Sequence, residues 1–404
     1  GRKMSVLYCL SPGLAQWAKP VFIALALGLA LPAGAETLAV KVLYLRQEVE
    51  RPPVLSNLDA VPEDLGLAGA ELALADNRTT GSFLGHDYSL TVISLPPGTD
   101  TAAEAKAALA EADLVLLDAP APGLLAVADL PEAGGKLLFN TSAGDEALRS
   151  TDCRANLLHT IPEDGARTDA LMQVLAAKRW MHLALVVGPK PADQAFADHL
   201  RRSAAKFGLT IVGEKPWTFD TDLRRAAVVE LPPFLMDLPE HDVLLVADET
   251  QDFGRYVPDN TYLPRPVAGS EGMVPLGWAP VLEQWGAVQL QERFEAQAGR
   301  EMQSRDFAAW AALRAIGEAV TRTGTADPAR LRAYLLSDAF QLDGFKGRGL
   351  SFRSWNGQLR QPIAVANARA LVAMAPVEGF LHPVNETDTL GLDAPESQCS
   401  AFKD

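Results

Sequence analysis

Residue types that could carry catalysis occur in the sequence, but their spacing matches no catalytic motif. The segment Ala268-Gly269-Ser270-Glu271-Gly272 approaches the nucleophile elbow of hydrolases, yet alanine stands where that motif has its first glycine. The six histidines are dispersed at no metal-ligand spacing, and there is no phosphate loop, dinucleotide fingerprint or His-Glu-x-x-His sequence. We therefore predict an ordinary turn at 268–272 and a protein that is not an enzyme.

A second group of residues could bind a small molecule, because they follow predicted strands or lie in the loops beside them. Arginine can grip a carboxylate with two parallel hydrogen bonds, tryptophan offers a face for stacking, and amide, hydroxyl and carboxylate groups fix orientation. The candidate ligand-binding residues are Arg46, Asn140, Thr141, Ser142, Arg149, Arg154, His159, Trp217, Glu249 and Trp278. A place in the core remains open for the two tryptophans, and a place on the solvated surface for Arg149 and Arg154.

The elements that must position these residues read as two successive series of strands and helices. In the first series, short apolar strands alternate with alanine-rich helices; the strands are predicted at 39–44, 88–95, 114–117 and 137–139, and the helices at 67–75 and 102–112. The second series has helices at 169–178 and 192–207 and strands at 183–187, 210–212 and 242–246, with a loop or a poorly formed helix at 230–239. The pattern predicts an α/β protein of two lobes, each a mainly parallel sheet flanked by helices.

The chain after residue 278 is predicted to return to both lobes. An amphipathic helix at 306–321 precedes further strands at 350–352 and 363–365, with a candidate crossover at 324–328. We assign residues 36–160 and 279–326 to the first lobe, and residues 161–278 and 327–404 to the second. Ligands of open α/β sheets lie beyond the carboxyl ends of the strands, so two facing sheets would close on a ligand by a hinge motion.

The first 35 residues have the features of an export signal. Three basic residues accompany an apolar run at 21–31, and Ala33-Gly34-Ala35 supplies a small-x-small cleavage site before Glu36. The alternative is a membrane anchor, but eleven residues of helix span only about 16 Å, against ~30 Å of hydrocarbon. Cleavage would change the formal charge from −15 to 33 − 51 = −18, an acidic balance that disfavours nucleic acid as a partner.

Two cysteines remain after the predicted cleavage, because Cys9 belongs to the signal. Cys153 and Cys399 are far apart in the sequence and would be exposed to an oxidising compartment. We predict a disulfide between them, which would tie the end of the chain to its middle. A metal pair and two free thiols are the alternatives.

The order of the lobes, the exported acidic chain and the helix at 306–320 resemble the periplasmic binding proteins of the branched-chain-amino-acid type. Segments at 331–336, 340–347 and 350–352 are similar to the usual ending of that family. The resemblance implies the two-lobed type I periplasmic binding fold, a soluble protein in the periplasm and an ABC permease in the inner membrane as partner.

A narrower resemblance rests on several short segments taken together, at 50–53, 65–70, 76–81, 153–159, 246–249, 264–269 and 352–362. As a set they look like the binding proteins of ABC systems found with pyrroloquinoline quinone (PQQ)-dependent alcohol dehydrogenases. This resemblance implies that PQQ, or something in its pathway, is the transported ligand; no cofactor is predicted. A flat tricarboxylate could be held by Trp217, Trp278, Arg46, Arg149 and Arg154, whereas Asp248-Glu249 at a strand end would oppose it.

Two other functions remain open at this stage. One is a binder of amino acids or small amides, which Asp248-Glu249 and the hydroxyl-bearing loop Asn140-Thr141-Ser142 favour. In amino-acid binders, an acidic residue near that strand end meets the ammonium of the substrate. The other is a module without a ligand that docks on a periplasmic alcohol dehydrogenase or cytochrome, which a cleft without converging polar groups would favour.

Overall fold

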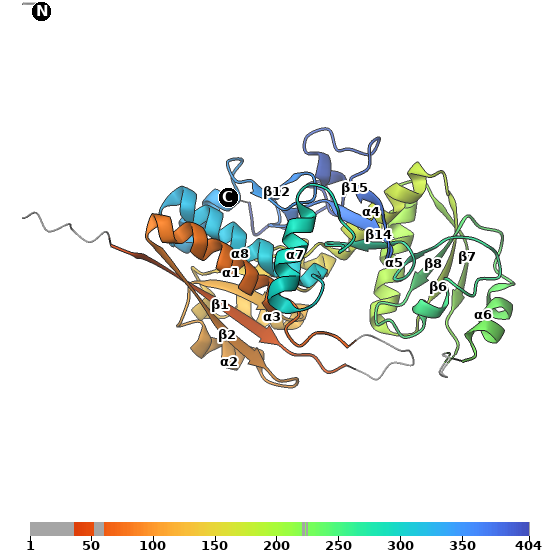
Figure 1. The fold of residues 1–404 in the computed structure, drawn as a ribbon, viewed down its shortest axis with the longest axis horizontal. Helices are drawn as coiled ribbons and strands as arrows, with labels where there is room; N and C mark the ends of the chain where they lie inside the picture. Colours follow the sequence, from red (N-terminus) through yellow and green to blue (C-terminus); the bar gives the residue numbers. More distant parts are fainter. Residues whose placement is uncertain (1–35, 52–59, 220–222, 224, 404) are drawn as a thin grey trace, which may run out of the picture. The chain divides into compact units, whose positions relative to one another are not determined.

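Two parallel β-sheets organise the chain (Figure 1). The structure is a computed structural model that describes residues 36–51, 60–219, 223 and 225–403. The predicted export signal at 1–35 lies outside the described residues. Residues 37–404 form one compact unit. No described helix is long and apolar enough to cross a membrane.

The first sheet has five parallel strands in the order β2-β1-β3-β4-β5. Their bounds are β1 Leu38–Gln47, β2 His86–Leu95, β3 Leu114–Asp118, β4 Leu137–Asn140 and β5 Leu157–His159. Every residue of β3 and β4 is buried, as expected for central strands of a parallel sheet with both faces covered. The linking helices are α1 Leu67–Leu84, α2 Thr101–Ala108 and α3 Ala121–Ala128.

Alternate residues of the central strands enter two different cores. Val42 and Tyr44 of β1 face the layer that contains α1, α7 (Ala287–Ala298) and α8 (Ser304–Thr323). Leu43 and Leu45 of the same strand face α2 and α3. Side chains of a strand point alternately to its two faces, so a continuous apolar run is what a strand between two helical layers requires.

Helices α1 and α8 approach each other closely at a glycine. A Cβ atom at Gly69 would lie 1.8 Å from the carbonyl oxygen of Asp306, which is backbone and cannot rotate away. We predict that Gly69→Ala destabilises the protein by about 1–3 kcal/mol, the usual cost of overpacking.

Chemical unfolding of Gly69→Ala beside Gly165→Ala tests this prediction. Gly165 is also helical, but its Cβ would lie at least 3.4 Å from every neighbour. That control should be neutral or slightly stabilising because alanine is the better helix former. Equal unfolding midpoints for the two variants would show that α1 and α8 can move apart without loss of stability, which would contradict the prediction.

The second sheet has four parallel strands in the order β7-β6-β8-β9. Their bounds are β6 His182–Val187, β7 Thr210–Pro216, β8 Val243–Ala247 and β9 Val267–Gly269. Helices α4 (Asp164–Ala177), α5 (Pro191–Lys206) and α6 (Ala227–Leu235) accompany this sheet. Segment 230–239, for which a loop or poor helix was expected, contributes the end of α6, which includes Pro232 and Pro233.

The remaining elements are short. One small antiparallel sheet consists of β10 (Val274–Leu276), β14 (Ile363–Ala366) and β15 (Leu371–Ala375). A second one consists of β11 (Leu342–Asp343), β12 (Gly349–Phe352) and β13 (Leu359–Arg360). The last α-helix described is α9, Pro328–Leu335. Four 3₁₀ helices are η1 Pro131–Ala133, η2 Glu146–Arg149, η3 Gly254–Tyr256 and η4 Glu386–Thr389.

The C-terminal third divides between the lobes differently from the assignment made from sequence. Leu331 and Leu335 of α9, with Phe340 and Phe352, belong to the core of the first lobe, although residues 327–404 were assigned to the second. In the described part of this region, Ile363 and Val365 of β14, Ala375 of β15 and Leu390 join the second core, whereas Ala364 and Ala366 of β14 belong to the first. Apolar periodicity reveals the buried side of α9, but it cannot say which of two similar cores receives that side.

The disulfide predicted between Cys153 and Cys399 is confirmed. It closes a loop of 246 positions and fixes the C-terminal segment to the first lobe, where both cysteines and Phe402 are part of the core.

Replacing both cysteines by serine should lower stability by about 2–5 kcal/mol, because the unfolded chain then gains the freedom of a very long loop. Urea unfolding of the double variant and of the oxidised wild type measures the difference. Wild-type protein titrated with dithiothreitol should move to the stability of the variant. A double variant as stable as the oxidised protein would contradict the prediction.

Candidate ligand-binding site

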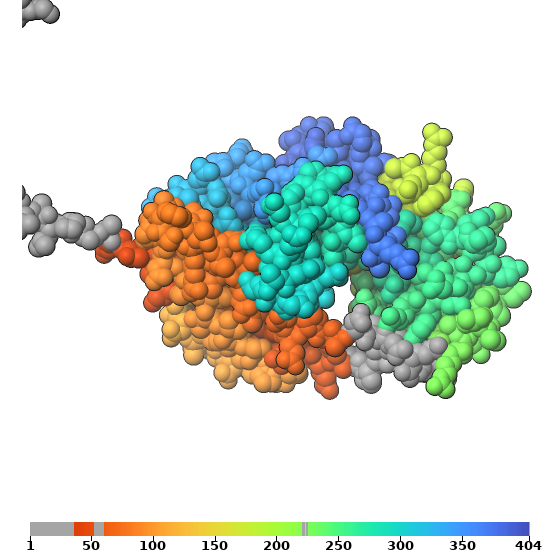
Figure 2. Space-filling model, viewed as in Figure 1, coloured from red at the N-terminus to blue at the C-terminus, as the bar shows by residue number. Residues whose placement is uncertain are grey.

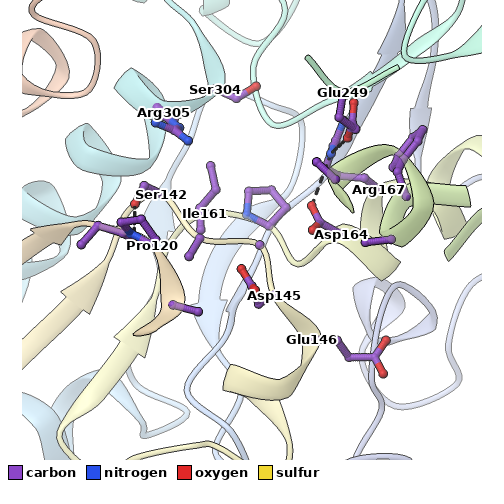
Figure 3. A pocket seen from close by; sticks show the side chains of 18 of the residues that line it. Pro120, Ser142, Asp145, Glu146, Ile161, Asp164, Arg167, Glu249, Ser304 and Arg305 are labelled. Carbon is purple, nitrogen blue, oxygen red and sulfur yellow. Dashed lines mark hydrogen bonds and ion pairs between the residues drawn. The ribbon is translucent and has the colours of Figure 1, made fainter. Parts of the chain in front are cut away.

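A cavity of about 770 Å³ lies at the carboxyl ends of the strands of both sheets. One wall comes from the loops after β1, β3 and β4, and the other from α4, the start of α5 and the loop after β8. Ile161 and Pro162, Leu276 and Gly277, and Ser304 and Arg305 complete the lining (Figure 3). The volume is typical of a small-molecule site.

The loop after β4 is shaped by the side chain of its first residue. Asn140 accepts hydrogen bonds from the backbone N–H groups of Ser142 and Ala143 at 3.1 and 2.9 Å, and its amide donates to the carbonyl of Ala143. Thr141 donates its hydroxyl to the carbonyl of Leu117 and is buried. Ser142 lines the cavity, with its hydroxyl hydrogen-bonded to the carbonyl of Ala119. Asn140 and Thr141 therefore stabilise the conformation of the loop, and Ser142 is the residue of the three that faces the cavity.

Arg149 and His159 are fully buried beneath this loop and do not line the cavity. Arg149 donates to the carbonyls of Ala143, Asp145 and Ile161 and to Oε1 of Gln358 at 2.7–3.0 Å. Burial lowers the pKa of Arg149 to about 10, and burial with the neighbouring Arg149 charge lowers the pKa of His159 well below its usual value. Both were candidates for ligand contact, and the structure gives them supporting positions instead.

Three other candidates also lie away from the cavity. Trp217 stacks on Phe253 with ring centroids 3.8 Å apart, and Trp278 stacks on Phe307 and donates its indole N–H to Gln291. Both rings are buried in the cores of their lobes. Arg154 forms a two-point ion pair with Asp129 on the surface. The two tryptophans thus occupy the core positions that the sequence analysis left open, and Arg154 occupies the surface position.

Arg46 is next to the cavity but is already engaged. Its Nε lies 3.2 Å from Oδ2 of Asp118, and its terminal nitrogens donate to the carbonyls of Glu63 and Leu65. Asp118, which lines the cavity, also accepts a hydrogen bond of 2.7 Å from the hydroxyl of Tyr44. Arg46 thus neutralises a cavity carboxylate from behind.

On the second lobe, Arg167 of α4 neutralises two carboxylates. Its NH1 lies 2.9 Å from Glu249 and 3.3 Å from Asp164, and all three residues line the cavity (Figure 3). Burial opposes the charge of Arg167, but these carboxylates outweigh it and raise its pKa. Glu249 also accepts a hydrogen bond from Ser270. Of the residues predicted from sequence, Ser142 and Glu249 are the two that line the cavity.

Two opposite charges in the lining have no partner among the residues that the structure describes. Five carboxylates line the cavity, and Asp118, Glu146, Asp164 and Glu249 each pair with an arginine. The carboxylate of Asp145 and the guanidinium of Arg305 form no hydrogen bond or ion pair with any residue the structure describes. Figure 3 places Arg305 on the side of Ser142 and Pro120, and Asp145 on another side of the same space. The site can therefore accept one anionic and one cationic group.

Sequence reasoning missed Asp145 and Arg305. Asp145 directly follows the loop 140–144 that was singled out, so extending that loop by one residue would have found it. Arg305 stands one residue before the predicted helix at 306–321, and nothing in the sequence brings that helix start to the cavity. Among the described residues, no cluster of three or more His, Cys, Asp or Glu side chains could hold a metal ion.

Solved structures with the same fold come from periplasmic binding proteins. The branched-chain amino-acid ABC transporter ligand-binding protein of Burkholderia xenovorans aligns with a TM-score of 0.68 at 17% identity, over 90% of this chain and all of that one. The leucine-, isoleucine-, valine-, threonine- and alanine-binding protein of Brucella ovis aligns with a TM-score of 0.61 at 15% identity, over 82% of this chain and 89% of that one.

A branched-chain amino-acid binding protein of Streptococcus pneumoniae, solved with isoleucine, gives a TM-score of 0.60 at 14% identity, over 83% of this chain and 98% of that one. The sequence matches no protein-family model and no curated protein. The predicted two-lobed periplasmic binding protein fold is thus confirmed, and at these identities the likeness establishes the fold alone.

Proposed function

We propose that this protein captures a small zwitterion of the amino-acid class and delivers it to an ABC permease. The observation that carries the proposal is a pair of charges in the cavity that have no partner among the described residues, Asp145 for the ammonium and Arg305 for the carboxylate. Ser142 adds a hydroxyl on the Arg305 side. Asp145 and Arg305 are both exposed to solvent, so water hydrates their charges when no ligand is bound. A zwitterion that enters the cavity would replace this water by one charge-assisted contact at each end, which favours a ligand with one group of each sign.

The apolar part of the lining suits an aliphatic side chain. Small residues are frequent, among them Ala119, Ala143, Ala192 and Ala195, and the aromatic rings in the described lining are those of Phe196 and His199. The proposal also draws on the solved structures, several of which are named as binders of leucine, isoleucine or related amino acids. Capture by such a protein takes place in the periplasm, as the export signal predicted at 1–35 requires.

The cavity offers less to PQQ. The tryptophans expected to stack on the quinone are in the cores, and Arg149 and Arg154 point elsewhere. Four of the five lining carboxylates are paired with arginines, so among the described lining residues a tricarboxylate would meet one guanidinium without a partner, Arg305, and one carboxylate without a partner, Asp145. Two of its three carboxylates would thus lack a cationic partner. The comparisons support neither PQQ nor an alcohol dehydrogenase as partner.

Isothermal titration calorimetry with a panel of ligands tests the proposal. The panel contains aliphatic L-amino acids, L-glutamine, PQQ, and 4-methylpentanoate, which is leucine without its ammonium. At least one amino acid should bind, and 4-methylpentanoate and PQQ should bind far more weakly. Binding of PQQ at micromolar concentration without any amino acid would replace the proposal, and no heat from any ligand would favour the docking module.

A further inference from the structure

The C-terminal strap, defined as residues 386–399, contacts both lobes and crosses from one to the other. Figure 2 shows the blue C-terminal segments next to the light-blue and cyan residues on one side and the green residues of the second lobe on the other. The strap begins in η4 and ends at the disulfide with Cys153. The bonds that hold the strap, described below, involve neither the Asp145 nor the Arg305 side chain, so the inference does not depend on the proposed function.

On the side of the second lobe, α4 and α5 hold the middle of the strap. Asp169 of α4 accepts a hydrogen bond of 2.8 Å from the N–H of Gly391. The same carboxylate forms an ion pair of 2.8 Å with Lys206 of α5. Lys206 also donates to the carbonyls of Thr389 and Gly391, and Leu390 is buried in the second core. The hydrogen bond between Asp169 and Gly391 is buried, whereas Lys206 is partly exposed to solvent.

On the side of the first lobe, the buried Arg353 and the partly buried Arg360 hold the same stretch. Asp388 lies 2.9 Å from Nε of Arg353 and 2.8 Å from Nε of Arg360, and Arg353 also donates to the carbonyl of Leu390 at 2.6 Å. Further along, Ser397 donates to the carbonyl of Arg149 at 2.7 Å. The disulfide at Cys399 then makes this end of the strap covalent.

We propose that the C-terminal strap restrains the rotation of the two lobes about the hinge, with the disulfide as its fixed end. The carboxylate of Asp388 and the carbonyl of Leu390 are held from the first lobe, while Thr389 and Gly391 are held from the second. Rotation of the lobes must break one of these two sets of bonds. The disulfide prevents the strap from following the second lobe beyond the reach of residues 392–399, so the Lys206 and Asp169 contacts break first.

Distance measurements between the lobes test this restraint directly. Nitroxide labels at Ser82→Cys on α1 and Glu240→Cys after α6, both exposed, report the separation by double electron–electron resonance in a Cys9→Ser background. The oxidised native pair does not react with the label. Lys206→Met removes the cation that holds the strap on α5, and Cys153→Ser with Cys399→Ser releases the other end.

Each release should broaden the distance distribution relative to the parent protein and add longer or shorter separations. The matched control is Arg201→Met on the same helix, whose side chain is 35% exposed against 32% for Lys206, and which pairs with Glu214 and Asp198 of its own lobe. The control should leave the distribution unchanged.

Two outcomes overturn the inference. One is an unchanged distribution in both released variants, even with lower melting temperatures, since the strap would then be a stabilising tail only. The other is equal broadening in Arg201→Met, which would show that any lost charge on α5 loosens the hinge. Failure of the ligand panel would leave this result untouched, because the labels report on the protein without ligand.

Discussion

Replacing Arg305 by glutamine should weaken binding of an amino-acid ligand by about tenfold or more. A hydrogen bond to a charged group contributes roughly 1.5–3 kcal/mol, and 1.4 kcal/mol corresponds to a factor of ten in Kd. Arg305 forms no ion pair with any described residue, so its removal costs the ligand contact without breaking an internal one. The variant should therefore fold and unfold like the wild type while losing affinity.

A ligand analogue makes this prediction more specific. The amide of the bound amino acid lacks the negative charge that Arg305 is proposed to meet. Wild-type protein should bind the amide more weakly than the acid, whereas Arg305→Gln should discriminate little between the two. Asp145→Asn should show the matching behaviour toward an analogue without the ammonium, because its carboxylate is proposed to meet that group.

Arg154→Gln is the control for these binding measurements. Arg154 is on the same lobe and was a candidate for ligand contact, but it pairs with Asp129 outside the cavity. Its replacement should leave the affinity unchanged. If calorimetry gave Arg305→Gln the affinity of the wild type, with the same preference for acid over amide, the assignment of the anion to Arg305 would fail.

Arg149→Met should lower the free energy of unfolding by about 3 kcal/mol, since each buried acceptor left without a donor costs about 1–3 kcal/mol. The change strands the carbonyls of Ala143, Asp145 and Ile161 and the amide oxygen of Gln358. Part of the loss is offset, because burying the guanidinium is itself unfavourable, as the lowered pKa of Arg149 shows. Methionine retains most of the apolar volume, which isolates the lost hydrogen bonds.

Urea unfolding of Arg149→Met and Arg154→Met compares a buried arginine with an exposed one. Arg154 and Asp129 have side chains 32% and 52% exposed, and surface ion pairs contribute about 0–1 kcal/mol. Arg154→Met should therefore change stability little. Similar unfolding midpoints for the two variants would mean that water replaces Arg149 at the four acceptors.

The sequence alone predicted the elements and several of their consequences. Runs of apolar residues such as 114–117 identify central strands, because a strand covered on both faces has no polar positions. The two series of strands and helices predict two lobes with a site at the strand ends, where Ser142 and Glu249 do line the cavity. The disulfide followed from the count of cysteines that remain after the predicted export signal.

Only the tertiary structure decided which charges are free. Glu249 follows a strand as an amino-acid site would require, but Arg167, 82 positions away, neutralises it. From the sequence, Arg149 was a candidate for ligand contact. In the structure its guanidinium is hydrogen-bonded to Gln358, 209 positions away, and to three backbone carbonyls. Local patterns determine which side of a strand or helix is buried, whereas the partner of a charge depends on which distant segments meet. In this protein the packing of distant segments leaves Asp145 and Arg305 without partners among the residues that the structure describes.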